Sequence, residues 1–244
     1  MEIYMKKLVA SLVLVLCSVN AQAILLTDLI NGGSITVGDK VFDDWEVLST
    51  FSYDDRFDTD NITDNIDVTG MNDGGLDPGP GLRYDISNGL FDLTGDGLLD
   101  FMFGFSVTVL DPLLRVKDNS LSLTDFEIFP PVDLSSIFIE ELVFADDRMT
   151  QLGSKNVEAS ELSDGNGGFT STAKLQDSAV FAPQSSIYVT TNILLEAFDP
   201  GERVLLTGFE QRFSQTSIDV PEPHAFMLWG AGLLIWVARR RQRK

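Results

Sequence analysis

Apolar and polar residues alternate along most of the chain with the two-residue period that is typical of β-strands. Aromatic and valine side chains occupy every second position of 101–109, and mostly apolar side chains do the same through 187–195. Further runs of strand length cover residues 121–129, 137–144, 169–175 and 203–213. Turn sequences separate the runs, and no segment between the two chain ends shows a helical period. The pattern predicts an all-β fold, a single antiparallel β-sandwich or jelly roll over residues 24–219.

More strands are predicted at the start of this domain. Residues 34–42 contain two apolar runs around a Gly-Asp pair and predict a hairpin. Alternation over residues 45–53 predicts a half-buried strand, with Trp45 and Phe51 on the same face. Further along, Ala182-Pro183 is interpreted as a turn between two strands.

The first 23 residues predict a secretory signal peptide. Two lysines precede the apolar run 8–19, and Ala21 and Ala23 supply small residues at the positions that a signal peptidase reads. Cleavage is predicted before Ile24. The domain is therefore expected to be exported.

The last 20 residues carry a second membrane-directed signal. Residues 225–238 are uncharged and largely apolar, and residues 239–244 contain five basic side chains, as at the cytoplasmic end of a membrane helix. A helix over 225–238 is about 21 Å long, whereas the hydrocarbon core of a bilayer is about 30 Å thick. The pattern predicts a short transmembrane helix that suits temporary better than permanent anchoring.

Directly before this helix stand Val220, Pro221, Glu222 and Pro223. This motif, followed by a short apolar helix and a terminal arginine cluster, resembles the PEP-CTERM sorting signal on exported proteins of Gram-negative bacteria that make exopolysaccharide. The resemblance implies that an exosortase removes the tail after transient anchoring in the inner membrane. It further implies delivery to the cell surface or the extracellular matrix. The alternative is an ordinary C-terminal anchor whose prolines end the preceding strand.

Charge narrows the possible partners. The chain has 37 acidic and 17 basic residues, of which two acidic and seven basic ones lie in the terminal segments 1–23 and 220–244. The remaining domain therefore carries a net charge of about −25, and this field repels nucleic acids. The negative charge is compatible with binding of divalent cations or of basic partners, and with a role in solubility alone.

The same central domain has neither cysteine nor histidine, because Cys17 and His224 lie in the terminal segments. Their absence excludes Ser-His-Asp and Cys-His catalysis, disulfides and histidine-ligated zinc. A hydrolase built on two carboxylates stays open, but no acidic pair stands in a distinctive context. We therefore predict a protein that is not an enzyme and needs no cofactor.

One loop has the composition of a metal site. Oxygen-bearing residues stand at positions one, three, five and nine of an EF-hand-type loop, with glycine at position six and a backbone carbonyl at position seven. The candidate calcium ligands are Asp92, Thr94, Asp96, Leu98 and Asp100. The match is incomplete, because position twelve is Phe103 rather than glutamate and a strand follows in place of a helix. The alternative is a tight Gly-Asp-Gly turn that feeds a core strand without metal.

Aromatic residues suggest a second kind of site. Trp45 and Tyr84, together with Tyr53 and Tyr188, are candidates for a platform on which sugar rings stack. Each also stands in a strand pattern, where aromatic side chains usually pack in the core.

These features favour a non-catalytic, exported surface or matrix protein that is associated with exopolysaccharide. Its expected processing partners are signal peptidase and exosortase. The alternative is a carbohydrate-binding β-sandwich, with or without calcium. A glycoside hydrolase built on two carboxylates is the third hypothesis.

Overall fold

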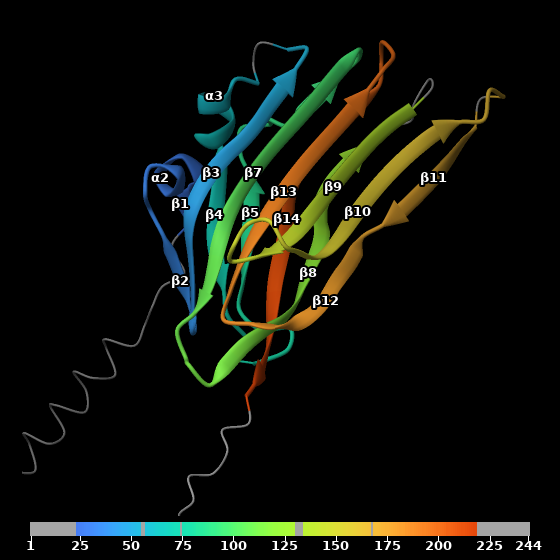
Figure 1. Cartoon of the computed structure of the whole chain (residues 1–244). Helices are drawn as coiled ribbons and strands as arrows, with labels where there is room; N and C mark the ends of the chain where they lie inside the picture. Colours follow the sequence, from blue (N-terminus) through green and yellow to red (C-terminus); the bar gives the residue numbers. More distant parts are fainter. Residues whose placement is uncertain (1–22, 55–56, 74, 130–133, 167, 219–244) are drawn as a thin grey trace, which may run out of the picture.

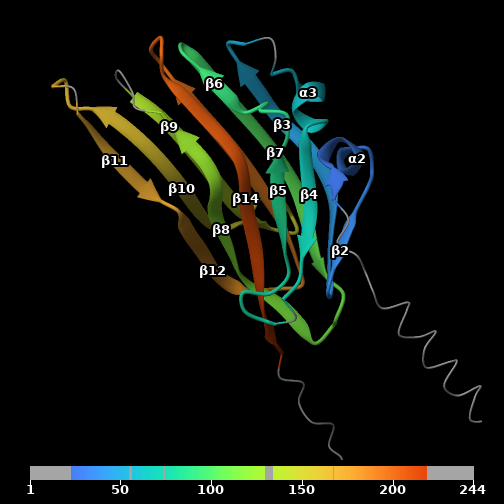
Figure 2. The same cartoon turned by 180° about the vertical axis from the view of Figure 1, so that it is seen from behind.

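The computed structural model describes residues 23–54, 57–73, 75–129, 134–166 and 168–218, which form two β-sheets packed face to face (Figures 1 and 2). Every strand pairing between these residues is antiparallel. The predicted all-β antiparallel sandwich is therefore confirmed. The sorting motif 220–223 and the signal-peptide residue Ala21 lie outside the described residues.

Strand β14 is the centre of the sheet that we call sheet A. The order is β1 (Ile24–Leu25), β4 (Ile66–Met71), β5 (Gly81–Ile86), β14 (Arg203–Ser217), β8 (Leu114–Ile128) and β12 (Gln176–Gln184). The short strand β6 (Asp92–Thr94) pairs with β14 on the same edge as β5. Strand β14 therefore has partners along both of its edges.

The opposite layer, sheet B, contains the strongest alternating runs. Its order is β11 (Phe169–Lys174), β10 (Gln151–Ser163), β9 (Leu134–Ala145), β13 (Ser186–Ala197), β7 (Gly97–Val109), β3 (Lys40–Ser52) and β2 (Ile35–Val37). Strands β2 and β3 form the predicted hairpin, with Ile35 opposite Phe42.

Two strands depart from the sequence prediction. Strand β10 was not predicted, because its inward positions include the charged Lys155, which is only 3% exposed. The predicted turn at Ala182-Pro183 instead lies inside β12, where the pairing with β8 shifts register between Val180 and Gln184. A register shift accommodates the proline, which has no backbone N–H for the ladder.

Two five-residue helices also depart from the prediction, α2 (Leu26–Ile30) and α3 (Thr59–Thr63). Each is too short to produce a helical period in the sequence. Helix α3 begins at Asp58, whose carboxylate accepts a hydrogen bond from the Asn61 N–H at 2.7 Å. This N-cap satisfies a backbone donor that the first helical turn leaves free.

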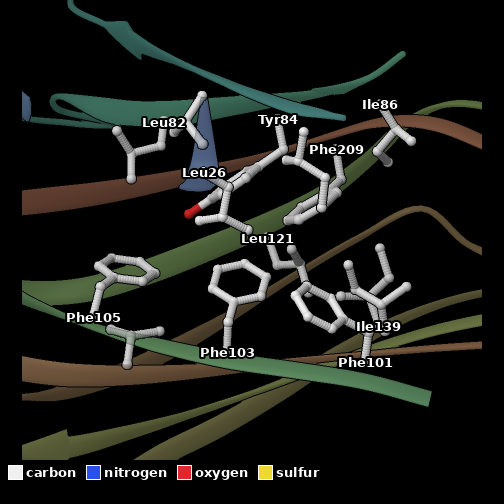
Figure 3. Close-up of a cluster of buried hydrophobic side chains, with 14 of the residues drawn as sticks. Leu26, Leu82, Tyr84, Ile86, Phe101, Phe103, Phe105, Leu121, Ile139 and Phe209 are labelled. Carbon is white, nitrogen blue, oxygen red and sulfur yellow. The ribbon is translucent and has the colours of Figure 1, made fainter. Parts of the chain in front are cut away.

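Aromatic side chains from both sheets fill the space between them (Figure 3). Phe101, Phe103 and Phe105 of β7 are fully buried. From sheet A, Tyr84 stacks on Phe209 with ring centroids 4.4 Å apart, and its ring lies 5.6 Å from that of Phe103. Burial of this apolar surface provides the main non-directional force that holds the two sheets together.

We predict that Phe103→Ala lowers the free energy of unfolding by about 3–5 kcal/mol, because it leaves a cavity at the centre of the core. Urea unfolding monitored by circular dichroism measures this change. Phe51→Ala is the matched control, since Phe51 is 53% exposed. It should cost no more than about 0.5 kcal/mol, the usual range at the surface. Equal costs for the two variants would contradict the described core.

Candidate functional site

A register shift in β3 determines which of its side chains reach the outer face of sheet B, the face turned away from sheet A. The pairing of β3 with β7 shifts between Val47 and Ser49. Trp45, before the shift, is buried in the core, whereas Phe51, after it, lies exposed opposite Asp100. The prediction that Trp45 and Phe51 share a face is therefore wrong, because a bulge reverses the alternation of the side chains.

Two aromatic rings are exposed as a result. Phe51 is 53% and Tyr53 69% exposed, and the rings meet edge to face with centroids 5.4 Å apart. The backbone of Tyr53 stays attached to the sheet, because its N–H donates to the Leu98 carbonyl at 3.3 Å. The pair thus presents apolar ring surface to solvent at the end of a well-anchored strand.

Beside the ring of Phe51 lies an open depression of about 380 Å³. Its lining combines aromatic rings with hydroxyl and carboxylate groups, from Thr50, Phe51, Ser52, Asp54, Phe57, Asp58 and Thr59. The hydroxyls of Thr50 and Thr59 lie 3.0 Å apart and connect the end of β3 to α3. The depression therefore has apolar and hydrogen-bonding walls, formed by the end of β3, the start of α3 and described residues between them.

The register of sheet B continues this surface from strand to strand. Starting from Phe51, the residues opposite one another on β7, β13, β9 and β10 are Asp100, Leu194, Phe138 and Glu158. The adjacent row contains Leu98, Glu196, Ser136 and Ser160. Within it, the Ser136 hydroxyl donates to the Glu196 carboxylate at 2.8 Å. Apolar side chains and hydrogen-bonding groups thus lie next to one another across the strands.

A second depression, of about 320 Å³, lies at the far end of these two rows. Its lining includes Ser136, Phe138, Glu158, Ser160 and Glu196. Four strand spacings separate β3 from β10, which corresponds to about 19 Å. The second depression therefore lies on the outer face, at this distance from Phe51. The first opens beside Phe51 between β3 and α3, because Thr50 and Ser52 in its lining lie opposite the inward-facing Phe101 and Leu99.

The β9–β10 hairpin packs on another part of this outer face through Arg148. Its guanidinium donates to Glu46 at 2.9 Å and to Asp44 at 3.2 Å, and it covers the ring of Tyr188 at 4.4 Å. Asp44 and Arg148 both have left-handed backbone conformations, with φ of 53° and 57°. Two carboxylates neutralise this arginine, so the cluster holds the hairpin in place and is poorly suited to anion binding.

Tyr188 completes this cluster. Its hydroxyl donates to Glu46 at 2.8 Å, and the ring packs on Gly104 so closely that a Cβ there would lie 2.0 Å from the hydroxyl oxygen. Burial, followed by the hydrogen bond to Glu46, raises the pKa of Tyr188. The phenol is therefore protonated and acts as a donor at neutral pH.

We predict that Gly104→Ala displaces Tyr188, breaks its hydrogen bond to Glu46 and costs about 1–3 kcal/mol of folding free energy. Thermal unfolding measures the loss. Gly75→Ala serves as the control, because its Cβ would have no neighbour closer than 3.6 Å. A Gly104→Ala variant as stable as the wild type would show that the packing of Tyr188 does not require glycine at position 104.

The candidate calcium residues are spread over two sheets. Asp92 and Thr94 belong to β6 of sheet A, whereas Leu98 and Asp100 belong to β7 of sheet B. Both carboxylate oxygens of Asp92 accept hydrogen bonds from the Arg203 guanidinium, at 2.6 and 2.7 Å.

Between the two strands, Gly95 and Asp96 have φ of 38° and 50°. Positive φ at two successive residues is the geometry of the tight turn that was the alternative to a calcium loop. This turn leads from one sheet to the other. Within the described ranges, no group of three or more His, Cys, Asp or Glu side chains could hold a metal ion. Calcium binding remains an untested prediction.

Trp45 and Tyr84, the proposed sugar-stacking residues, lie inside the sandwich. Trp45 is 5% exposed, and its indole N–H donates to the Phe42 carbonyl at 3.2 Å. Tyr84 is fully buried, and its hydroxyl lies 3.2 Å from the Gln211 side-chain oxygen (Figure 3). The assignment of these two residues to a ligand site is therefore wrong. Of the four candidate aromatics, Tyr53 alone is widely exposed.

Most of the residues in the predicted terminal signals lie outside the described ranges. Of the predicted signal-peptidase site, Ala23 is exposed and Ile24 begins β1, the first described strand. No helix among the described residues is long and apolar enough to cross a bilayer. The predicted membrane segment 225–238 lies outside the described residues.

Comparisons with known proteins identify no family. No protein-family model and no curated protein matches the chain. Similar solved structures include a carbohydrate-binding module with specific mannan recognition, which is 8% identical over 81% of this chain and 97% of that one, with a TM-score of 0.31. A family 11 xylanase from Neocallimastix patriciarum is 5% identical over 76% and 95% of the two chains, with a TM-score of 0.26.

A family 11 carbohydrate-binding module from Clostridium thermocellum is 8% identical over 70% of this chain and 95% of that one, with a TM-score of 0.20. It was solved with a β-1,3-1,4-mixed-linked tetrasaccharide. Scores this low show neither a shared family nor a shared function.

Proposed function

We propose that the sandwich is a non-catalytic carbohydrate-binding domain, and that a polysaccharide lies across the outer face of sheet B. The observation that carries this proposal is the exposed pair Phe51 and Tyr53 at one end of two rows of carboxylate, hydroxyl and apolar side chains. Because the two rows run across the strands from β3 to β10, the polysaccharide chain is expected to lie across the strands as well.

The chemistry of the face suits a sugar chain. Sugar rings have apolar C–H faces that stack on aromatic rings, and hydroxyl groups that donate to carboxylates. Phe51 and Tyr53 supply the first kind of contact, while Asp100, Glu158 and Glu196 supply acceptors on neighbouring strands. An anionic polymer would be repelled by these carboxylates, so the proposed ligand is a neutral polysaccharide.

Export and sorting belong to the same proposal. The signal peptide at 1–23 and the motif from Val220 to Pro223 support passage through the inner membrane, removal of the tail by an exosortase, and release to the cell surface or matrix. A protein in that location meets exopolysaccharide. The binding face gives this matrix protein a way to attach to it.

We predict that Phe51→Ala and Tyr53→Ala each weaken binding to a neutral glycan found by array screening. The expected loss is about tenfold, or about 1.4 kcal/mol, measured by isothermal titration calorimetry. Phe169→Ala is the matched control, because Phe169 is 50% exposed but lies on β11, far from the aromatic pair. An array without any bound glycan contradicts the proposal. Release of reducing ends from a polysaccharide would contradict its non-catalytic part.

For the tail, we predict that replacing Pro221 and Glu222 by alanine leaves the C-terminal segment attached and the protein in the inner membrane. Cell fractionation and intact mass in an exosortase-containing host measure this. Replacement of the proline pair Pro130-Pro131 by alanine is the control and should leave sorting unchanged. Unaltered processing of the Pro221/Glu222 variant would identify the tail as an ordinary anchor.

A further inference from the structure

Three polar side chains meet in the core between the two sheets, away from the proposed binding face. Lys155 of β10 and Glu141 of β9 are cross-strand partners in sheet B, and both point toward sheet A. Asn119 lies on β8 of sheet A, which packs against β10 (Figure 2). The amine of Lys155 contacts both the Asn119 side-chain oxygen and the Glu141 carboxylate.

These three side chains are sealed from solvent. Asn119 and Glu141 have no exposed surface, and Lys155 is 3% exposed. The surroundings keep the amide in one orientation, because the Asn119 side-chain N–H donates to the Arg212 carbonyl at 3.1 Å. The carbonyl end of the amide is therefore the end presented to the lysine amine. A nucleophile, a carbonyl group and a carboxyl group are thus preassembled in a dry site.

We propose that Lys155 and Asn119 form an intramolecular isopeptide bond, which covalently joins sheet B to sheet A. The Lys155 Nζ lone pair attacks the Asn119 side-chain carbon, and a C–N bond forms while the bond from that carbon to Nδ2 breaks. The nitrogen leaves as ammonia. The reaction exchanges one amide for another, so no oxidant, reductant or other co-reactant is required.

Glu141 is positioned to move the protons of this exchange. As the carboxylic acid it donates a proton to the Asn119 oxygen during attack, and as the carboxylate it takes a proton from Nζ. Transfer of that proton to Nδ2 lets ammonia leave as the C–N bond breaks. The proton on the former Asn119 oxygen then returns to Glu141 as the carbonyl re-forms, which regenerates the acid. Each proton is accounted for, and Glu141 is unchanged at the end.

The electrostatics of the site supports this chemistry. Burial lowers the pKa of Lys155 and raises the pKa of Glu141, and the attraction between the two groups opposes both shifts. Burial thus favours the neutral amine and the neutral acid, which are the reactive forms. Asp118 and Asp177 also act on Lys155 from a distance and raise its pKa.

An exposed cluster of a lysine, an asparagine and a carboxylate provides an internal control. The Lys174 amine lies 2.8 Å from the Asn156 side-chain oxygen and 2.7 Å from the Asp177 carboxylate. The side chain of Lys174 is 42% exposed. This cluster lacks the dry, enclosed surroundings of Lys155, so Lys174 is expected to remain unmodified.

Tryptic peptide mapping of the full chain tests the bond independently of processing at either end. Without the bond, trypsin releases residues 118–148, 149–155 and 156–174 as three separate peptides. With the bond, cleavage after Lys155 is blocked. The digest then contains one branched peptide, in which 118–148 is joined to 149–174 with the loss of one ammonia. Cleavage after Lys174 in the same digest is the control and should be complete.

Recovery of the three separate peptides from the folded wild-type chain would overturn the proposal. Glu141→Gln keeps the size of the side chain but has no carboxyl proton to transfer, so its digest should show the separate peptides. Circular dichroism verifies its fold, and Asp177→Asn should leave the branched peptide unchanged. A fully cross-linked, folded Glu141→Gln variant would refute the role of Glu141. If this variant does not fold, the wild-type digest alone still decides whether the bond exists.

Discussion

The burial of Lys155 and Glu141 between the sheets is the constraint on which the rest of the sandwich depends. Aromatic packing attracts the sheets without defining how they align, because the hydrophobic effect has no direction. A buried polar group, in contrast, requires hydrogen-bond partners at particular positions. Lys155 finds Glu141 beside it in sheet B and Asn119 across the interface in sheet A. This contact fixes where β8 lies against β10.

The same constraint extends to the outer surface. Successive side chains of a strand point to opposite faces. Because Lys155 points inward, Glu158 lies on the outer face of β10. Because Glu141 points inward, Phe138 lies on the outer face of β9. A slip of one residue would move Lys155 and Glu141 into water and the outer residues into the core. The same strand register therefore places the core contact on the inner face of sheet B and the proposed glycan-binding residues on its outer face.

A covalent link between the sheets would suit the location proposed for this protein. The domain has no cysteine, so disulfides cannot reinforce it outside the cell. The proposed link would close a loop between Asn119 and Lys155, whose separation is 36 residues, and would connect two sheets that otherwise rely on packing. Such a link would therefore stabilise the folded sandwich without a disulfide.

The sequence alone determined the all-β class, the position of most strands, the turn at Gly95-Asp96 as one of two alternatives, and the signals at the two ends that suggest export. Those features are local: strand alternation, turn chemistry and apolar runs are visible within a few residues. Only the tertiary structure decided which side chains are buried. The bulge in β3 moved Phe51 to the surface while Trp45 stayed inside. The sheet interface placed Lys155 in the core, although lysine is usually exposed. Burial depends on partners from distant strands, so the candidate binding face and the cross-link site emerged only after the two sheets were assembled.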